Sequence, residues 1–360
     1  MKWLLLCIPV ALICAHAEGV PASLTFSSAA LAIIPLAAML VASTEQLAYR
    51  TSPTIGALIN GTFGNAPELI ISMMALRAGL LDVVKASLVG VILNNLLFVL
   101  GLAFLVGGLR YRVQKYNRHG ARIQRSVLMV AAISIIVPSV FDNFIPPNMV
   151  SQENGLNVGV AVVLLVTYGL SLLFMLKTHT EYFSTKDEGD VADETERWGF
   201  PRALGALILS SVMLSLMSEI LVGAIEATAA SAGISKAFIG VIIIALIGGA
   251  PESVAAVAMA RKNKLDMTMG IAVGSSIQIA LFVAPALMLS SYYIAPRPLN
   301  LMVGNAGIMI VLFPVLLLSM IVGDGRSNWF KGVQLLSVYA LIALFCYYLP
   351  DSLAAPLFPR

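Results

Sequence analysis

The chain has 360 residues, of which 59% are hydrophobic and 11% are charged, with a formal net charge of +3. Its mean hydropathy is +0.91. Soluble globular domains carry about 25% charged residues, so the composition excludes an ordinary soluble domain and predicts an all-α polytopic membrane protein. The small net charge gives no indication of nucleic-acid binding. Cys7, Cys14 and Cys346 lack the spacing of a disulfide framework or a zinc site.

Apolar runs divide the chain into about eleven predicted transmembrane helices, most of which reach the ~20 residues needed to cross a bilayer. In chain order, they are 3–17, 24–48, 55–77, 83–107, 123–141, 157–176, 203–231, 236–260, 266–290, 299–322 and 332–350. The first run, within 1–23, is expected to be an extra amino-terminal helix. Its single Lys2, short apolar stretch and Ala-His-Ala ending also fit a signal peptide.

The Lys and Arg residues predict the orientation, because cytoplasmic loops of membrane proteins carry an excess of them. With the amino terminus inside, 17 of the 22 Lys and Arg residues fall on the cytoplasmic side of the predicted topology. The acidic stretch within 177–201 is then a cytoplasmic linker, either a solvated connection or a regulatory, cation-gathering segment. Residues 351–360 form a short carboxy-terminal tail.

An internal repeat relates the two halves of the chain. Residues 64–99 align without a gap on 248–283, at an offset of 184 residues, and 12 of the 36 positions are identical. We therefore predict two five-helix units, 24–176 and 202–350. An odd number of crossings makes the second unit enter the membrane from the opposite side. This inverted repeat is typical of secondary transporters whose binding site lies at the midplane.

Each repeat places the same helix-breaking cluster in an apolar run, "GNAPEL" at 64–69 and "GGAPES" at 248–253. Proline lacks an N–H, so Pro67 and Pro251 are expected to free the backbone carbonyls of Phe63 and Ile247. Glu68 and Glu252 follow the prolines directly. An ionisable side chain at mid-membrane depth indicates a functional site, although a neutral structural carboxyl group is the alternative.

The two clusters together offer carboxylate, carbonyl and amide oxygens, with the amide coming from Asn65. All-oxygen ligation suits a hard cation such as Ca²⁺. Two carboxylates hold one divalent cation or two protons and are neutral in either state. Protons and metal would therefore compete for the same site, which is an exchange mechanism.

These residues resemble a known family. The stretches 44–101 and 218–285 are similar to the paired signatures of the calcium/proton exchangers, in the calcium/cation antiporter superfamily. The resemblance covers nearly the whole chain and implies a retained first helix before two five-helix repeats. It implies that Glu68 and Glu252 bind the cation and protons, with Asn65, Ser275, Ser276 and Gln278 lining the site. It also implies that Glu45 and Glu219 line the access path.

The chain departs from the family pattern at four positions. Gly249 and Ser253 stand where the family has Asn and His in the second repeat, and Val91 and Asn94 stand at two serine positions of the first. Gly249 removes one amide oxygen from the expected ligands. Water could fill the gap, Asn94 could compensate, or the preferred ion could differ.

The leading functional hypothesis is a secondary-active antiporter that exports Ca²⁺ in exchange for H⁺, with no cofactor and no enzymatic activity. The alternatives are an antiporter of Na⁺, K⁺ or Mn²⁺ for H⁺, and a relative that no longer transports. A channel is disfavoured by the inverted repeat. A membrane-embedded hydrolase is disfavoured by the lack of a nucleophile or metalloprotease motif. The expected location is the bacterial plasma (inner) membrane, with the lipid bilayer as partner.

Overall fold

The computed structural model describes residues 2–51, 53–142, 150–179, 198–350 and 357–358. Most of the predicted acidic linker and of the carboxy-terminal tail lies outside these residues. The described chain is almost entirely helical, as the sequence predicts, and its strands are limited to one two-residue pair.

The first half begins with a short 3₁₀ turn at Lys2–Leu6 and continues into eight helices. They are α1 (Cys7–His16), α2 (Ala22–Ala48), α3 (Pro53–Phe63), α4 (Ala66–Arg77), α5 (Leu81–Leu93), α6 (Leu100–Arg110), α7 (Arg118–Asp142) and α8 (Val150–Leu173). A π-helical turn, η2 (Asn94–Val99), joins α5 to α6, and η3 (Phe174–Thr178) extends α8.

The second half repeats this order. Its helices are α9 (Phe200–Ala232), α10 (Lys236–Phe238), α11 (Ala245–Gly248), α12 (Ala250–Arg261), α13 (Leu265–Gln278), α14 (Ala284–Ile294), α15 (Asn305–Ile321) and α16 (Trp329–Tyr348). The π-helical turns η5 (Ile239–Ile244) and η6 (Ile279–Val283) join α10 to α11 and α13 to α14. Strands β1 (Gln114–Lys115) and β2 (Arg326–Ser327) pair antiparallel.

Seven helical spans among the described residues are long and apolar enough to cross a membrane, or eight if one bent pair counts as a span. That pair is Lys236–Gly248 and Ala250–Arg261, bent by 57°. The shorter apolar helices are Trp3–His16 and Asn305–Ile321. The chain is thus a polytopic α-helical membrane protein, but the predicted number of eleven crossings is not confirmed.

One predicted segment, 299–322, becomes helical only at Asn305. The residues before it take an extended path whose backbone groups bond to side chains. The N–H of Leu299 donates to Ser291 Oγ at 2.7 Å, and that of Val303 donates to Ser139 Oγ at 2.8 Å. These hydrogen bonds satisfy backbone N–H groups that a helix would otherwise satisfy. The predicted helix start at 299 is therefore too early, because an apolar run does not reveal such side-chain partners.

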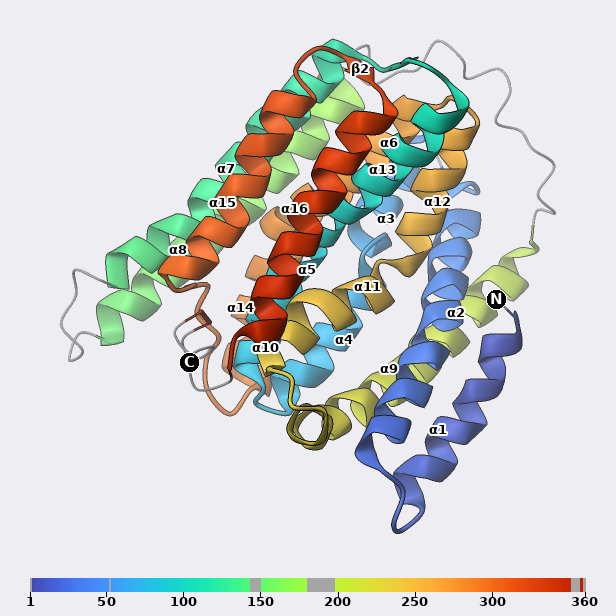
Figure 1. The fold of residues 1–360 in the computed structure, drawn as a ribbon, viewed down its shortest axis with the longest axis vertical. Helices are drawn as coiled ribbons and strands as arrows, with labels where there is room; N and C mark the ends of the chain where they lie inside the picture. Colours follow the sequence, from blue (N-terminus) through green and yellow to red (C-terminus); the bar gives the residue numbers. More distant parts are fainter. Residues whose placement is uncertain (1, 52, 143–149, 180–197, 351–356, 359–360) are drawn as a thin grey trace.

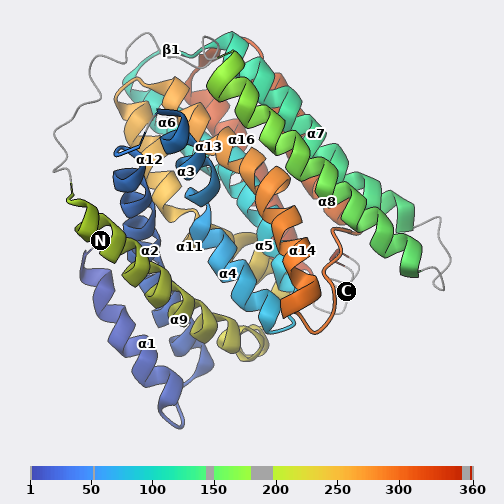
Figure 2. The ribbon, with the colours of Figure 1, turned by 180° about the vertical axis from the view of Figure 1, so that it is seen from behind.

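The helices form two flanks around a central group (Figures 1 and 2). Helices α7, α8 and α15 run side by side on one flank, and α1, α2 and α9 form the other. Helix α2 packs along α9, and α1 packs on α2 with Ala11 fully buried. The helices carrying the Gly-x-Ala-Pro-Glu clusters lie between the flanks, where α4 is largely buried and α12 exposes Val254.

The packing follows the internal repeat. Helix α6 packs against α12 and α16, and its counterpart α14 packs against α4 and α8, the counterparts of those two. Each repeat therefore places its third helix between a half-helix of the other repeat and that repeat's last helix. This reciprocal packing brings the two clusters to one region of the bundle.

Candidate functional site

Each cluster interrupts a helix where the sequence predicts it. Helix α3 ends at Phe63 and α4 begins at Ala66, and α11 ends at Gly248 before α12 begins at Ala250. The prolines lie in the first turns of α4 and α12, where a missing N–H costs no hydrogen bond. The breaks are therefore built into the sequence.

The breaks orient charge toward the centre of the bundle. Glu68 and Glu252 lie in the first turns of α4 and α12, where the positive end of the helix dipole favours a carboxylate. Phe63 and Ile247 lie in the last turns of α3 and α11, where backbone carbonyls lack an intrahelical partner. A cation between the halves would meet carbonyl oxygens from one half-helix and a carboxylate from the next.

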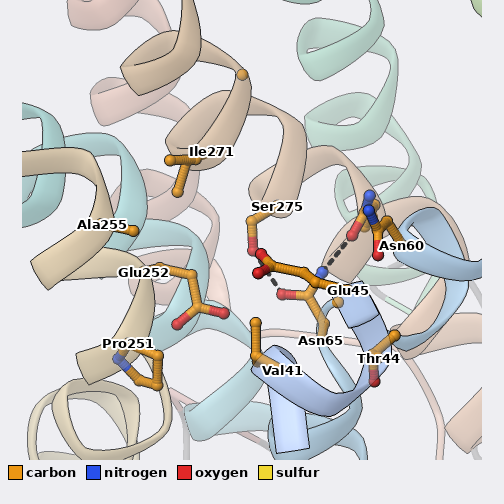
Figure 3. A pocket seen from close by; sticks show the side chains of 13 residues that line it. Val41, Thr44, Glu45, Asn60, Asn65, Pro251, Glu252, Ala255, Ile271 and Ser275 are labelled. Atoms are coloured by element: carbon orange, nitrogen blue, oxygen red, sulfur yellow. Dashed lines mark hydrogen bonds between the residues drawn. The ribbon is translucent and has the colours of Figure 1, made fainter. Parts of the chain in front are cut away.

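A cavity of about 280 Å³ lies beside the two breaks. Figure 3 shows side chains from both repeats around it, with Glu252 and Asn65 pointing into it from different walls. The lining residues are Val41, Thr44, Glu45, Asn60, Gly64, Asn65, Pro251, Glu252, Ala255, Gly270, Ile271, Ser275 and Gln278. Five predicted site residues are among them, namely Glu45, Asn65, Glu252, Ser275 and Gln278.

A chain of hydrogen bonds holds Asn65 across the repeats. Its Nδ2 donates to Gln278 Oε1, and its Oδ1 accepts from Ser275 Oγ, both at 2.5 Å (Figure 3). Asn95 Nδ2 donates in turn to Ser275 Oγ at 3.1 Å. An amide oxygen has two lone pairs, so Asn65 Oδ1 retains capacity for a cation while its direction is held by α13.

The two carboxylates differ in exposure. Glu68 is 4% exposed, and neither of its carboxylate oxygens has a hydrogen-bond partner among the described residues. Its Oε1 lies against Gly248 of the other break, 3.3 Å from where a Cβ would stand. Glu252 is partly exposed in the cavity wall, and its Oε2 is buried and unpartnered in the described structure. Unpaired buried carboxylates are costly, so these two groups favour binding protons or a cation.

The cavity lies toward one end of the bundle. We call this the basic end; it carries the β1–β2 pair, and Gln114 Nε2 there donates to Ala260 O. Arg110, Arg112, Lys115, Arg118, Arg261, Lys262, Lys264, Arg326 and Lys331 lie there. The lining residues come from the half-helices that reach this end. Glu45, Asn60 and Gly270 are exposed at the cavity's mouth, whereas Glu68 is buried beyond it.

Toward the opposite end the bundle is closed by α5 and η5, which pack without intervening side chains. A Cβ on Gly90 would lie 2.3 Å from Val241 O, and one on Gly240 would lie 2.5 Å from the Cβ of Ala86. The repeat relates Gly90 to Gly274 and Ala86 to Gly270. A Cβ on Gly270 or Gly274 would meet no atom within 4 Å, so the equivalent crossing at the basic end is open.

Six predicted site residues do not line this cavity, namely Glu68, Asn94, Glu219, Ser276, Phe63 and Ile247. Glu219 is an exposed residue of α9. Ser276 is fully buried and donates to Ala272 O at 2.9 Å. Phe63 and Ile247 can contribute only backbone carbonyls. Their roles remain predictions.

The sequence interpretation missed two polar lining residues: Thr44, whose hydroxyl donates to Leu40 O, and Asn60, which is exposed in α3 one turn before the break. An amide in an apolar run, at that spacing, is a signal that could have identified Asn60. Within the described residues, no three His, Cys, Asp or Glu side chains cluster as a metal site.

Comparison with known proteins identifies the family. The model of the sodium/calcium exchanger protein family matches residues 21–177 and again 202–348. The chain is 39% identical to a Ca(2+)/H(+) antiporter of Aphanothece halophytica, covering 96% of both chains. It is 39% identical to the Ca(2+)/H(+) antiporter ChaA of Bacillus subtilis, over 90% of this chain and 92% of the relative.

Solved structures agree. Native YfkE superposes with a TM-score of 0.82 at 35% identity, covering 96% of this chain and 98% of that one. The H⁺/Ca²⁺ exchanger CAX has the same fold, with a TM-score of 0.72 at 16% identity over 99% of this chain and 93% of that chain. The chain therefore belongs to the sodium/calcium exchanger protein family, as a calcium/proton-exchanger-like member of the calcium/cation antiporter superfamily.

Proposed function

We propose that this chain is a secondary-active calcium/proton antiporter that exports Ca²⁺ from the cytoplasm in exchange for H⁺ by alternating access. The observation that carries the proposal is a pair of glutamates, Glu68 and Glu252, at breaks contributed by the two repeats, whose buried Oε1 and Oε2 of Glu68 and Oε2 of Glu252 have no hydrogen-bond partner among the described residues. The relatives named as Ca²⁺/H⁺ antiporters support the choice of ions.

Charge balance supplies the mechanism. One Ca²⁺ or two protons neutralise the pair Glu68 and Glu252, so the site can cross between its two accessible states loaded with either. Empty and doubly charged, it would carry two uncompensated buried charges, which is the most costly state. That cost suppresses return of the empty carrier and couples the two fluxes.

The one-sided cavity supports alternating access. Opening at the basic end with closure by α5 and η5 is one of the two states that an inverted repeat can adopt. The excess of Lys and Arg assigns the basic end to the cytoplasm, so this state is inward-facing, with Glu45 at its mouth. Glu219, in the corresponding helix of the second repeat, would line the path in the outward-facing state. A bacterial plasma membrane with the amino terminus inside is part of the proposal.

Radiolabelled Ca²⁺ uptake into inside-out vesicles with an acid interior tests the proposal. Wild type should accumulate Ca²⁺ until a protonophore is added, and Glu68→Gln and Glu252→Gln should each abolish accumulation, because a neutral amide cannot release a proton. Glu226→Gln is the control, since Glu226 is an exposed carboxylate bonded to Lys236 at the far end of α9. It should transport normally.

Two results would contradict the proposal. Transport at the wild-type rate by both Gln variants would remove the paired carboxylates from the mechanism. If the vesicles accumulated no Ca²⁺ but Na⁺, K⁺ or Mn²⁺ dissipated the pH gradient, the same fold would exchange a different cation. Expression and melting temperature of each variant must match wild type, so that lost transport reflects lost chemistry.

A further inference from the structure

The two helix breaks are unequal at one position. The repeat relates Asn65 to Gly249, and it relates Gln278 to Asn94. In the first pair, Asn65 Nδ2 donates to Gln278 Oε1 across the interface between repeats. In the second, the partner of Asn94 has no side chain. The site thus has two amides on one side of its pseudo-symmetry axis and one on the other.

Asn94 occupies the place that a side chain at position 249 would need. A Cβ built on Gly249 would stand 2.5 Å from Asn94 Nδ2 and 3.1 Å from Ala245 O. Such a separation is well inside van der Waals contact, and Asn94 is fully buried in η2. Because Nδ2 is the far end of a side chain, an asparagine at 249 would turn the Asn94 amide away from its present position.

The amide of Asn94 lacks a protein partner. Both its Oδ1 and its Nδ2 are buried without a hydrogen bond among the described residues. A buried amide group that is left without a hydrogen bond destabilises the fold. Glu68, which packs on the adjacent Gly248, has two orphaned carboxylate oxygens of its own. Two unsatisfied side chains therefore meet successive residues of the second break.

We propose that Asn94 supplies to the cation the amide oxygen that the second break lacks, and that Gly249 is the space this amide requires. The inference rests on the proposed cation exchange and assigns the ligand to η2 instead of to the broken helix. Coordination would then combine Glu68 and Asn94 on the buried side of the second break with Glu252 and Asn65 on the cavity side. Two amides and two carboxylates from both repeats suit a hard cation.

Three variants of the full-length chain, purified in detergent, test the pairing. Asn94→Ala removes the amide, Gly249→Asn adds a competing one, and the double variant Asn94→Ser with Gly249→Asn moves the amide from η2 to the break. Gly223→Asn is the control for introducing asparagine, because a Cβ on Gly223 meets nothing within 4 Å. Each protein is titrated with Ca²⁺ by calorimetry, and its melting temperature is measured with and without Ca²⁺.

Asn94→Ala should weaken Ca²⁺ binding about tenfold, since losing a ligand or its support costs 10–100-fold in metal affinity. Gly249→Asn should weaken binding by a similar factor and lower the Ca²⁺-free melting temperature, because it displaces Asn94. The double variant should recover both the affinity and the melting temperature. Gly223→Asn should match wild type in both.

Ca²⁺ affinity unchanged in Asn94→Ala would overturn the inference, and so would a double variant whose Ca²⁺ affinity is no better than that of Gly249→Asn alone. The melting temperatures measured without Ca²⁺ test whether an asparagine at 249 displaces Asn94. This test does not depend on which cation the protein transports. If Mn²⁺ stabilises wild type and Ca²⁺ does not, the proposal that Ca²⁺ is the transported ion is wrong. The same variants are then titrated with Mn²⁺ to test the role of Asn94. Failure of the proposed function is seen separately, in Glu68→Gln and Glu252→Gln.

Discussion

Glu45 contributes an exposed carboxylate to the cavity wall, whereas Glu219 lies on the corresponding helix of the other repeat, away from the cavity. A carboxylate at a mouth raises the local concentration of cations without taking part in the tight site. The two residues should therefore act on opposite sides of the membrane. This sidedness is specific to an alternating-access carrier.

We expect Glu45→Gln to raise the Ca²⁺ concentration for half-maximal transport about threefold to tenfold from the basic-end side alone. Glu219→Gln should have its effect from the opposite side. Uptake into inside-out and right-side-out vesicles, at low and high ionic strength, separates the two. Effects on the same side, or effects that salt does not reduce, would contradict the assignment.

At the scale of helices, two equivalent helix crossings, one at Gly90 and one at Gly274, differ in how closely they pack. This difference shows which end of the bundle is closed. Gly90 on α5 touches the backbone of η5, while its counterpart Gly274 on α13 has open space around its Cβ position. If the repeats exchange conformations, Gly274 must approach α3 as Gly90 now approaches η5. Gly270, by contrast, corresponds to Ala86 and so already has a methyl-bearing equivalent in the closed crossing.

Gly274→Ala should fold with a normal melting temperature and yet exchange Ca²⁺ about fivefold to 150-fold more slowly, because overpacking by one methyl group costs roughly 1–3 kcal/mol in the closed crossing. Gly270→Ala is the matched control and should transport nearly normally. Gly90→Ala should instead lower the melting temperature, since its clash exists in the present state. Equal rates for the two α13 variants would contradict the exchange of crossings.

Much of this arrangement of helices could be predicted from the sequence. Apolar runs and Gly-Pro breaks are local patterns, and the repeat is found by aligning the chain with itself. The helix break at Pro67 follows from them, whereas the convergence of Asn65 with Ser275 is implied by the family resemblance. The one-sided opening could not be predicted, since both crossings have glycines and only packing distinguishes them. The contact of Asn94 with Gly249 was one of three open alternatives, because a missing side chain does not say what fills its space.

At the scale of the whole molecule, two flanks lie on either side of a centre, and this centre contains the buried Glu68, Asn65, Asn94 and Asn95. The outer helices α7 and α8 expose large apolar residues such as Val130, Ile133 and Val163, as lipid-facing surfaces do. Hydrogen bonds between loops at the basic end tie the repeats together, including that from Gln114 to Ala260 O. A bundle built this way can change its accessible side only by moving the helices in the centre against the flanks.

Cysteine labelling tests the orientation of the whole bundle. In a background lacking Cys7, Cys14 and Cys346, Ala255→Cys places a thiol in the cavity, and Arg297→Cys places one at the opposite end, where Arg297 is exposed. A membrane-impermeant maleimide should label Ala255→Cys from the cytoplasmic side and Arg297→Cys from outside. Adding Gly274→Ala should increase labelling of Ala255→Cys, because closure of the basic end is hindered. Labelling of Ala255→Cys from outside alone would reverse the orientation that Lys and Arg predict, and with it the direction of Ca²⁺ movement.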